Sequence, residues 1–206
     1  MKNNHTWVIC AYGESEFLEA CILSLQAQTL SSNIICYSST PLDSIKQLCQ
    51  KYGVPFYSKE GGGIGKDWNN ALSFVETSYA TIAHQDDYYE PTYLEAVMQK
   101  IEQSKDILIA YTDYFEEKNG VKIPANTNLK IKTLMLKTLN LMPASRFWRN
   151  RVLAFGNPIS CPAVTYNLEA LKDFRFDEEM RVSLDWYAWY KISAYKGRFA
   201  YISEKL

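Results

Sequence analysis

The chain lacks any run of about 20 consecutive apolar residues, the length that a helix needs to cross a bilayer. The apolar stretch at 7–10 is also too short for the hydrophobic region of a secretory signal. The five cysteines are scattered and form no Cys-x-x-Cys pair, which argues against a disulfide framework and against a zinc site. These absences disfavour the membrane-spanning and disulfide-rich classes. We therefore expect a cytoplasmic protein.

Two common nucleotide-binding loops are also missing. Residues 61–65 are rich in glycine, but Lys66 is followed by Asp67 where a P-loop requires Ser or Thr. No Gly-x-Gly-x-x-Gly fingerprint follows the first predicted strand, and the Gly-Gly-x-Gly-Thr-Arg signature of sugar-phosphate nucleotidyltransferases is absent there too. The glycine tract is therefore either a flexible turn or a close backbone approach to a ligand.

Acidic residues are absent from 118–168, although eight Lys or Arg residues lie there. One interpretation is an ordinary solvated surface. The other is a flap that faces an anionic membrane, because bulky apolar residues interleave with the basic ones as they do in interfacial helices. A lipid-linked acceptor would account for such a flap. The apolar residues are Leu134, Met135, Leu139, Leu141, Met142, Phe147 and Trp148.

What the chain does contain is an alternation of strand and helix patterns. Its 47% hydrophobic and 22% charged residues are typical of a soluble globular protein. Short β-branched runs alternate with apolar residues at helical spacing, which predicts a mostly parallel sheet with helices on both faces. The best-signalled helix has Thr40 as cap, Pro41 in its first turn and Asp43 as capping-box carboxylate; Ser15 is a candidate cap for the helix before it. Strands are predicted at 7–11, 34–37, 55–58, 80–83 and 107–111.

The second half differs. Asn119-Gly120 predicts a hairpin, and strands are expected at 161–166 and 199–202, with a helix beginning near Ser183. We expect one domain over 1–206, in which 1–112 binds the ligand and 113–206 forms a smaller appendage.

Polar residues follow several of the predicted strands, and in open α/β sheets these ends meet at one ligand-binding edge. Asp86 and Asp87 stand at the end of the fourth strand. Two adjacent carboxylates repel each other, and a divalent cation shared with a diphosphate would compensate, with Mg²⁺ or Mn²⁺ suited to such oxygen ligands. The alternative is that both aspartates cap the turn before Pro91.

The order of these elements carries a resemblance. Segments 7–12, 63–72 and 82–91, followed by Phe-Asp-Glu-Glu-Met-Arg-Val-Ser-Leu-Asp-Trp-Tyr at 176–187, resemble glycosyltransferase family 2 over nearly the whole chain. The resemblance implies the α/β fold called GT-A, with a Rossmann-like central sheet. It also implies an inverting, metal-dependent, hexosyltransferase-like enzyme that moves a sugar from UDP or another nucleoside diphosphate to a saccharide or lipid-linked hydroxyl.

The resemblance also implies site residues. Asp86 aligns with the metal-binding carboxylate, and Asp185 aligns with the base that acts on the acceptor hydroxyl. The expected cofactor is Mn²⁺ or Mg²⁺, no nucleic-acid partner is expected, and peripheral contact with the inner face of an anionic membrane fits the basic segment 118–168. The expected nucleotide-sugar contacts are Ala11, Tyr12, Glu14, Ser38, Gly65, Lys66, Asn69, His84, Gln85 and Asp87.

Four departures from the family pattern keep a second hypothesis open. His84 stands where the leading aspartate of the metal motif is expected, so it either contacts the donor ribose or phosphate or ligates the metal through a neutral imidazole. Trp68 replaces an arginine. Leu184 replaces the first acid of the Glu-Asp pair, and the aspartate after the second strand is missing. The alternative function is therefore a nucleotide-sugar-binding module that has lost catalysis.

Overall fold

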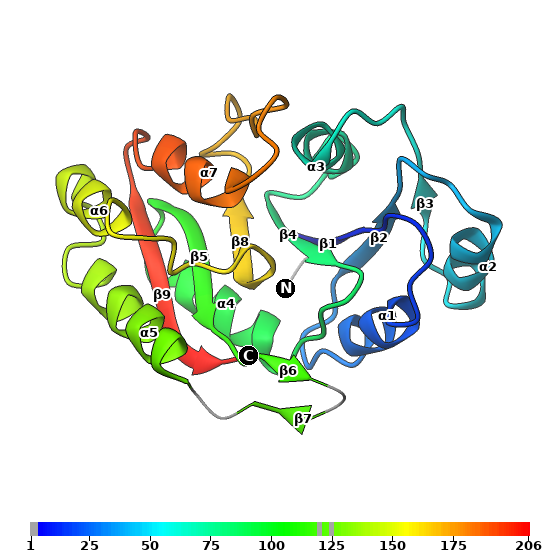
Figure 1. Ribbon diagram of the computed structural model, residues 1–206, viewed down its shortest axis with the longest axis horizontal. Coiled ribbons are helices and arrows are strands. Elements are labelled where there is room, and N and C mark those ends of the chain that lie inside the picture. Colours follow the sequence, from blue (N-terminus) through cyan, green and yellow to red (C-terminus); the bar gives the residue numbers. More distant parts are fainter. Residues whose placement is uncertain (1–3, 119–120, 124–125) are drawn as a thin grey trace.

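The computed structural model describes residues 4–118, 121–123 and 126–206 and shows an α/β fold around a seven-stranded sheet (Figure 1). The strand order is β3-β2-β1-β4-β8-β5-β9. Strand β1 pairs in parallel with β2 and β4, which confirms the expected parallel core. The strands are β1 (His5–Cys10), β2 (Asn33–Tyr37), β3 (Phe56–Tyr57), β4 (Tyr79–His84), β5 (Ile107–Asp113), β8 (Val164–Asn167) and β9 (Arg198–Lys205).

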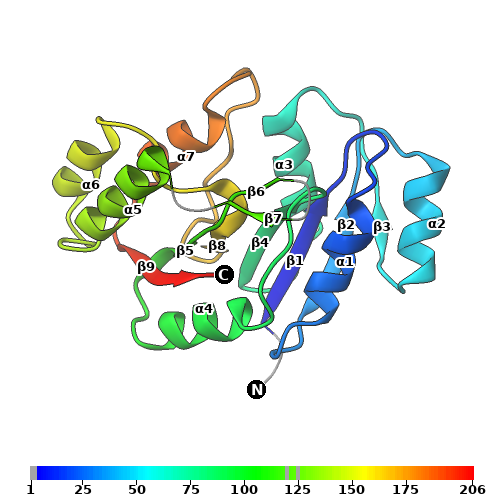
Figure 2. The ribbon, with the colours of Figure 1, turned by 60° about the horizontal axis from the view of Figure 1, so that its bottom comes forward.

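Helices cover both faces of this sheet. One face carries α1, α2 and α4, whose apolar side chains pack with Trp7 and Ile9 of β1. The other carries α3, α5, α6 and α7, and Trp189 of α7 packs there against strands β5, β8 and β9. Figure 2 shows α1 and α4 on one side of the sheet and α3 and α7 on the other. The helices are α1 (Leu18–Gln26), α2 (Asp43–Lys51), α3 (Ile64–Leu72), α4 (Tyr93–Glu102), α5 (Thr127–Leu139), α6 (Arg146–Leu153) and α7 (Leu184–Ile192).

The strand predicted at 161–166 differs from its prediction at both ends. Cys161–Ala163 forms a 3₁₀ turn, and the strand β8 begins at Val164. Pro162 accounts for the late start, because it has no backbone N–H for a ladder. Strand β8 lies antiparallel between β4 and β5, with Thr81 opposite Thr165, so the sheet is mixed.

Two predicted helix caps are wrong. Helix α2 begins at Asp43 with Leu42 as its cap residue, and helix α1 has Phe17 at that position. Thr40 is used elsewhere: its hydroxyl accepts from the backbone N–H of Gly13 at 3.0 Å, which ties the loop after β1 to the loop after β2. Ser15 accepts from the N–H of Phe17 at 3.2 Å, one residue before α1.

The hairpin residues Asn119 and Gly120 lie outside the described residues. The segments that flank them, β6 (Glu117–Lys118) and β7 (Val121–Lys122), pair antiparallel, as a hairpin requires. Within the described parts of the chain, none of the helices has both the length and the apolarity to cross a membrane.

Candidate functional site

A cleft of about 670 Å³ opens at the carboxyl ends of β1, β2 and β4. This is the edge where open α/β sheets bind ligands. Aromatic and polar groups share its wall: Tyr12, Tyr37, Ser39, Asp67, Trp68, His84, Gln85, Asp86 and Arg181.

The loops that form the cleft are tied to one another by hydrogen bonds. The Gln85 side chain brackets the backbone of Tyr12, accepting from its N–H at 3.2 Å and donating to its carbonyl at 2.9 Å. The N–H of Ala11 donates to the carbonyl of Tyr37 at 2.9 Å. Because its backbone is held, Tyr12 can leave its side chain 70% exposed at the mouth of the cleft.

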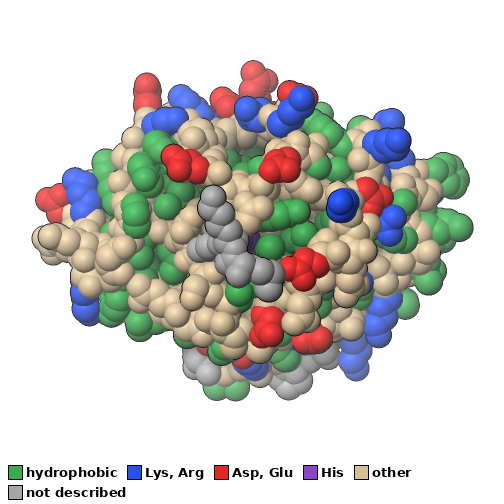
Figure 3. Space-filling view, turned by 180° about the vertical axis from the view of Figure 1, so that it is seen from behind, with side chains coloured by type: hydrophobic (Ala, Val, Ile, Leu, Met, Phe, Trp, Pro, Cys, Tyr) green, Lys and Arg blue, Asp and Glu red, His purple; other side chains and the backbone are tan. Residues whose placement is uncertain are grey.

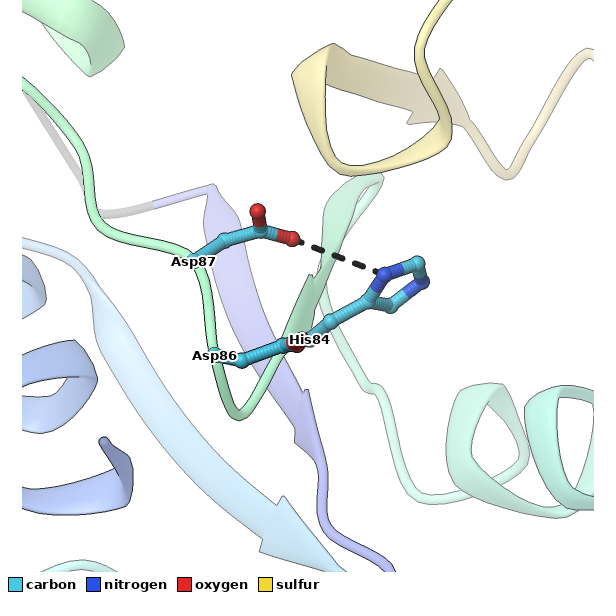
Figure 4. Close-up of side chains that lie close together, drawn as sticks. All are labelled: His84, Asp86 and Asp87. Carbon is cyan, nitrogen blue, oxygen red and sulfur yellow. Dashed lines mark ion pairs between the residues drawn. The ribbon is translucent and has the colours of Figure 1, made fainter. Parts of the chain in front are cut away.

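His84, Asp86 and Asp87 form a cluster after β4, with one ligand atom from each lying within 4.8 Å of the others. In Figure 4 the Asp87 carboxylate and the His84 imidazole point toward each other, and Oδ2 lies 3.5 Å from Nδ1. The imidazole stacks on Trp68 with ring centroids 5.5 Å apart. Nε2 of His84 is buried, and no hydrogen-bond partner for it occurs among the described residues.

The electrostatics of this cluster favour a cation. Burial and then the charge of Asp86 raise the pKa of Asp87 to about 6. Burial lowers the pKa of His84, although Asp86 and Asp185 oppose the shift, so the imidazole is neutral and able to act as a ligand. Carboxylate oxygens and an imidazole nitrogen suit Mn²⁺ or Mg²⁺, and a divalent ion would relieve the repulsion between the two aspartates. The residues present therefore fit such an ion.

Asp185 lies in the first turn of α7, after Ser183 in a left-handed conformation (φ 54°). Its Oδ2 accepts from the side-chain amide of Asn157 at 2.7 Å, and Oδ1 accepts from the N–H of Trp186 at 2.8 Å. The carboxylate is half-buried, and its charge contributes to the pKa of His84. Asp185 is not among the residues that line the main cleft, and its link to the cluster is this charge interaction with His84.

Gly65 and Asn69, two of the predicted nucleotide-sugar contacts, hold another loop in place and do not line the cleft. At Gly65, a Cβ atom would lie 2.1 Å from the carbonyl oxygen of Asp177. Asn69 donates to the carbonyl of Phe176 at 3.0 Å and accepts from its N–H at 2.9 Å. Both residues therefore position the segment 176–181, which brings Arg181 to the cleft and leads into α7.

Of the other predicted contacts, some line the main cleft, one lines a second cleft, and the rest line neither. Ala11, Tyr12, His84 and Gln85 line the cleft, together with the predicted metal ligand Asp86. Asp87 lines a second cleft of about 490 Å³, together with Tyr88 and Phe115, and Asp86 lines both clefts.

Three more predicted contacts lie outside the lining of the main cleft. Ser38 is fully buried and accepts from the N–H of Thr40 at 3.1 Å. Lys66 donates to the carbonyl of Gly61 at 3.2 Å, and Glu14 is exposed.

Sequence reasoning missed Asp67 and Arg181, which both line the main cleft. The signal for Asp67 is its place directly before Trp68, inside the run that resembles the family's helix motif. Arg181 lies inside the run 176–187 that resembles the family, but that run does not show that the side chain reaches the cleft, because a long-range contact brings the segment there.

Comparison with known proteins identifies the family of the chain. The profile described as Glycosyl transferase family 2 matches residues 6–162. Glycosyltransferase GlyA of Streptococcus pneumoniae serotype 4 is 24% identical over 123 residues, which are 56% of this chain and 18% of GlyA. Chondroitin synthase of Escherichia coli is 26% identical over 173 residues, 78% of this chain and 25% of that protein. The chain thus spans a quarter or less of these relatives.

Solved structures share the fold. Staphylococcus aureus TarS 1–349 matches with a TM-score of 0.75 at 19% identity, covering 98% of this chain and 58% of TarS. Mannosyltransferase PcManGT from Pyrobaculum calidifontis matches with a TM-score of 0.73 at 12% identity, covering 99% and 56%. With three quarters of its length matched by the family profile and its architecture shared with these enzymes, the chain belongs to glycosyltransferase family 2 and has the GT-A fold.

Proposed function

We propose that this chain transfers a sugar from a nucleoside diphosphate to an acceptor hydroxyl. The observation that carries the proposal is a ligand-sized cleft at the sheet edge whose wall includes His84 and Asp86 of the cluster, with Asp87 beside them. The charge of Asp185 also acts on His84. The fold neighbours support it, since TarS has been solved with UDP-GlcNAc and PcManGT with GDP-Man and Mn²⁺.

The donor occupies the cleft with its nucleoside between Tyr12 and Tyr37 and its diphosphate toward Asp86. Arg181, which lines the cleft, supplies a positive charge for the phosphates. Asp86 is the central metal ligand, with Asp87 and His84 beside it. The divalent ion, when bound, offsets the negative charge that develops on the departing diphosphate.

Asp185 acts as general base. It takes the proton of the acceptor hydroxyl while that oxygen forms a bond to the anomeric carbon. The bond from the anomeric carbon to the diphosphate oxygen breaks on the opposite face, so the configuration inverts and a nucleoside diphosphate leaves. The amide of Asn157, 2.7 Å from Oδ2, holds the carboxylate in one orientation. The acceptor enters by the second cleft, which Asp87 and Tyr88 line.

The test is titration calorimetry with UDP and GDP, in Mn²⁺ and in EDTA. We expect binding at least tenfold tighter with Mn²⁺, and Asp86→Ala abolishes that gain, whereas the exposed Asp173→Ala retains it. Equal affinity in EDTA, unchanged by Asp86→Ala, overturns the metal assignment. Failure of every nucleotide to bind the wild type overturns the proposed function.

The alternative, a binding module without catalysis, is favoured by one observation. Trp68 stacks on His84 where the family pattern has an arginine, so a cationic contact to the nucleotide is lost. Such a module would bind nucleotide sugars yet release no nucleoside diphosphate, and a product assay with UDP- and GDP-sugars separates the two functions.

We also propose that the edge formed by α5 and α6 contacts an anionic membrane that carries the acceptor, in polysaccharide or glycolipid synthesis. This edge lies on the right of Figure 3, where hydrophobic side chains lie among Lys and Arg. Arg149 is not part of this surface, because it is buried and donates to the carbonyls of Pro143, Ser193 and Gly197. The exposed members are Lys130, Leu134, Lys137, Leu141, Met142, Arg146, Phe147, Arg151 and Phe155.

A further inference from the structure

The carboxylate of Asp67 stands in the wall of the main cleft without a cationic partner among the described residues. Its Oδ2 accepts from the hydroxyl of Ser39 at 2.9 Å. The two lysines that most closely precede Asp67 in sequence are engaged elsewhere: Lys66 donates to the carbonyl of Gly61, and Lys59 to the hydroxyl of Ser73. A half-buried carboxylate that faces a cleft and lacks a cation seeks N–H donors.

The surroundings of Asp67 suit a flat, polar ring. Tyr37 lies beside it, with its hydroxyl 3.5 Å from Oδ1, and Tyr12 and Trp68 also line the cleft. Gly61 keeps space open next to the carboxylate. A Cβ atom there would lie 3.0 Å from Oδ1 of Asp67 and 2.6 Å from Cβ of Ser39.

The position of Asp67 within the cleft separates it from the metal cluster. Asp67 comes from the first turn of α3 and lies near the end of β2, whereas Asp86 follows β4. The diphosphate of a nucleotide sugar lies between the nucleoside and the sugar. With the diphosphate toward Asp86, the nucleoside end lies against the wall that contains Asp67 and Ser39.

We propose that Asp67 selects the nucleobase of the donor by accepting a ring N–H, so that the cleft takes uracil or guanine and rejects cytosine and adenine. This inference rests on the proposed function, because it assigns the base of the same donor. Uracil and guanine carry a protonated ring nitrogen on their pairing edge, which a carboxylate accepts. Cytosine and adenine present a lone pair there, which a carboxylate repels. The Ser39 hydroxyl orients the Asp67 carboxylate by donating a hydrogen bond to Oδ2.

The experiment is calorimetry of the wild type with UDP, GDP, CDP and ADP in Mn²⁺. We expect UDP or GDP to bind more tightly than CDP and ADP, by about tenfold or more. Asp67→Asn replaces one acceptor oxygen with a donor, so it weakens UDP and GDP about tenfold and strengthens CDP. Asp43→Asn is the matched control, since Asp43 also lies in the first turn of a nine-residue helix and the charge change is the same.

A second variant keeps the proposal open to refutation if Asp67→Asn folds poorly by thermal melting. Asp67→Glu keeps the charge but moves the carboxylate, and it should weaken UDP and GDP without strengthening CDP. Nucleotide binding with no base preference, or a preference unchanged in both variants, overturns the role of Asp67 while leaving the proposed function in place. Absence of all nucleotide binding to the wild type overturns both.

Discussion

The side chain of Asn69 pairs with the backbone of Phe176 as a neighbouring strand would, with bonds of 3.0 Å to the carbonyl and 2.9 Å from the N–H. The two residues are 107 positions apart in sequence. A third bond, from Nδ2 to Glu178 at 3.0 Å, extends the contact along the segment. Helix α3 therefore holds the segment that leads to Arg181 and Asp185.

Asn69→Ala should loosen this segment. The variant leaves the Phe176 backbone without its partners, and we expect a stability loss of about 1–3 kcal/mol together with faster amide exchange at 176–181. Exchange mass spectrometry checks the second effect. Asn128→Ala, at an exposed site on α5, is the control and should change stability by less than about 0.5 kcal/mol. Unchanged exchange at 176–181 would contradict the positioning role.

Gly65→Ala should displace the same segment by a different route, because its Cβ would lie 2.1 Å from a backbone oxygen of Asp177. We expect destabilisation of about 1–3 kcal/mol in chemical denaturation, and a larger loss of transfer than of nucleotide affinity. Gly62→Ala is the matched control. Its Cβ would meet only the flexible side chain of Lys66, at 2.8 Å from Cδ, so it should cost far less. Equal effects of the two substitutions would refute this account.

Asp185→Asn keeps the shape of the side chain but cannot take a proton. The variant should fold, retain nucleotide and Mn²⁺ affinity, and lose transfer by about 10² to 10⁴-fold, the usual contribution of a positioned base. Slow hydrolysis of the donor should suffer less, because water can lose its proton by another route. Single-turnover assays with an identified acceptor measure the loss. A rate within a few-fold of the wild type would remove Asp185 from the mechanism.

The buried side chain of His5 predicts that the folded protein loses stability in acid. Burial lowers its pKa from 6.5 to about 3, and its ring nitrogens bond to the hydroxyls of Ser32 and Thr81. The unfolded chain therefore binds a proton that the folded chain excludes. The resulting stability is fully present above about pH 6.5 and is lost as pH falls toward 3, by up to about 1.4 kcal/mol per pH unit.

The check is urea unfolding of the wild type and His5→Gln between pH 3 and pH 7. Glutamine does not titrate, so its stability curve should be flatter in this window. Carboxylates contribute equally to both proteins, and the difference between the curves isolates His5. Parallel curves would exclude it as the source.

The α5–α6 edge should bind vesicles that contain phosphatidylglycerol and release them in high salt. Arg146→Ser with Arg151→Ser removes two exposed charges and should weaken co-sedimentation about tenfold or more. Lys105→Ser with Lys172→Ser removes two exposed charges elsewhere and should have a small effect. Equal binding to neutral phosphatidylcholine vesicles, or equal loss in both double variants, would show that this edge has no specific role.

Local patterns in the sequence were sufficient for most of the helices and strands. The apolar spacing of Leu18, Cys21, Ile22 and Leu25 indicated the buried face of α1, and the structure buries all four. The carboxylates after the fourth strand were visible because a strand end and two adjacent acids lie next to each other in the chain. These features depend on neighbours within a few residues, so periodicity and spacing reveal them.

Only the tertiary structure decided which distant segments meet. No local signal places β8 antiparallel between β4 and β5, because strand pairing depends on partners far away in the chain. Nor does spacing show that Arg149, one of eight basic residues in 118–168, is buried against backbone carbonyls. Gly65 and Asn69 carried the family motif, yet their contacts with Asp177 and Phe176 exist only once α3 packs beside that segment. The sequence thus determined the elements and the chemistry of individual residues, whereas long-range packing determined which of those residues face the same cleft.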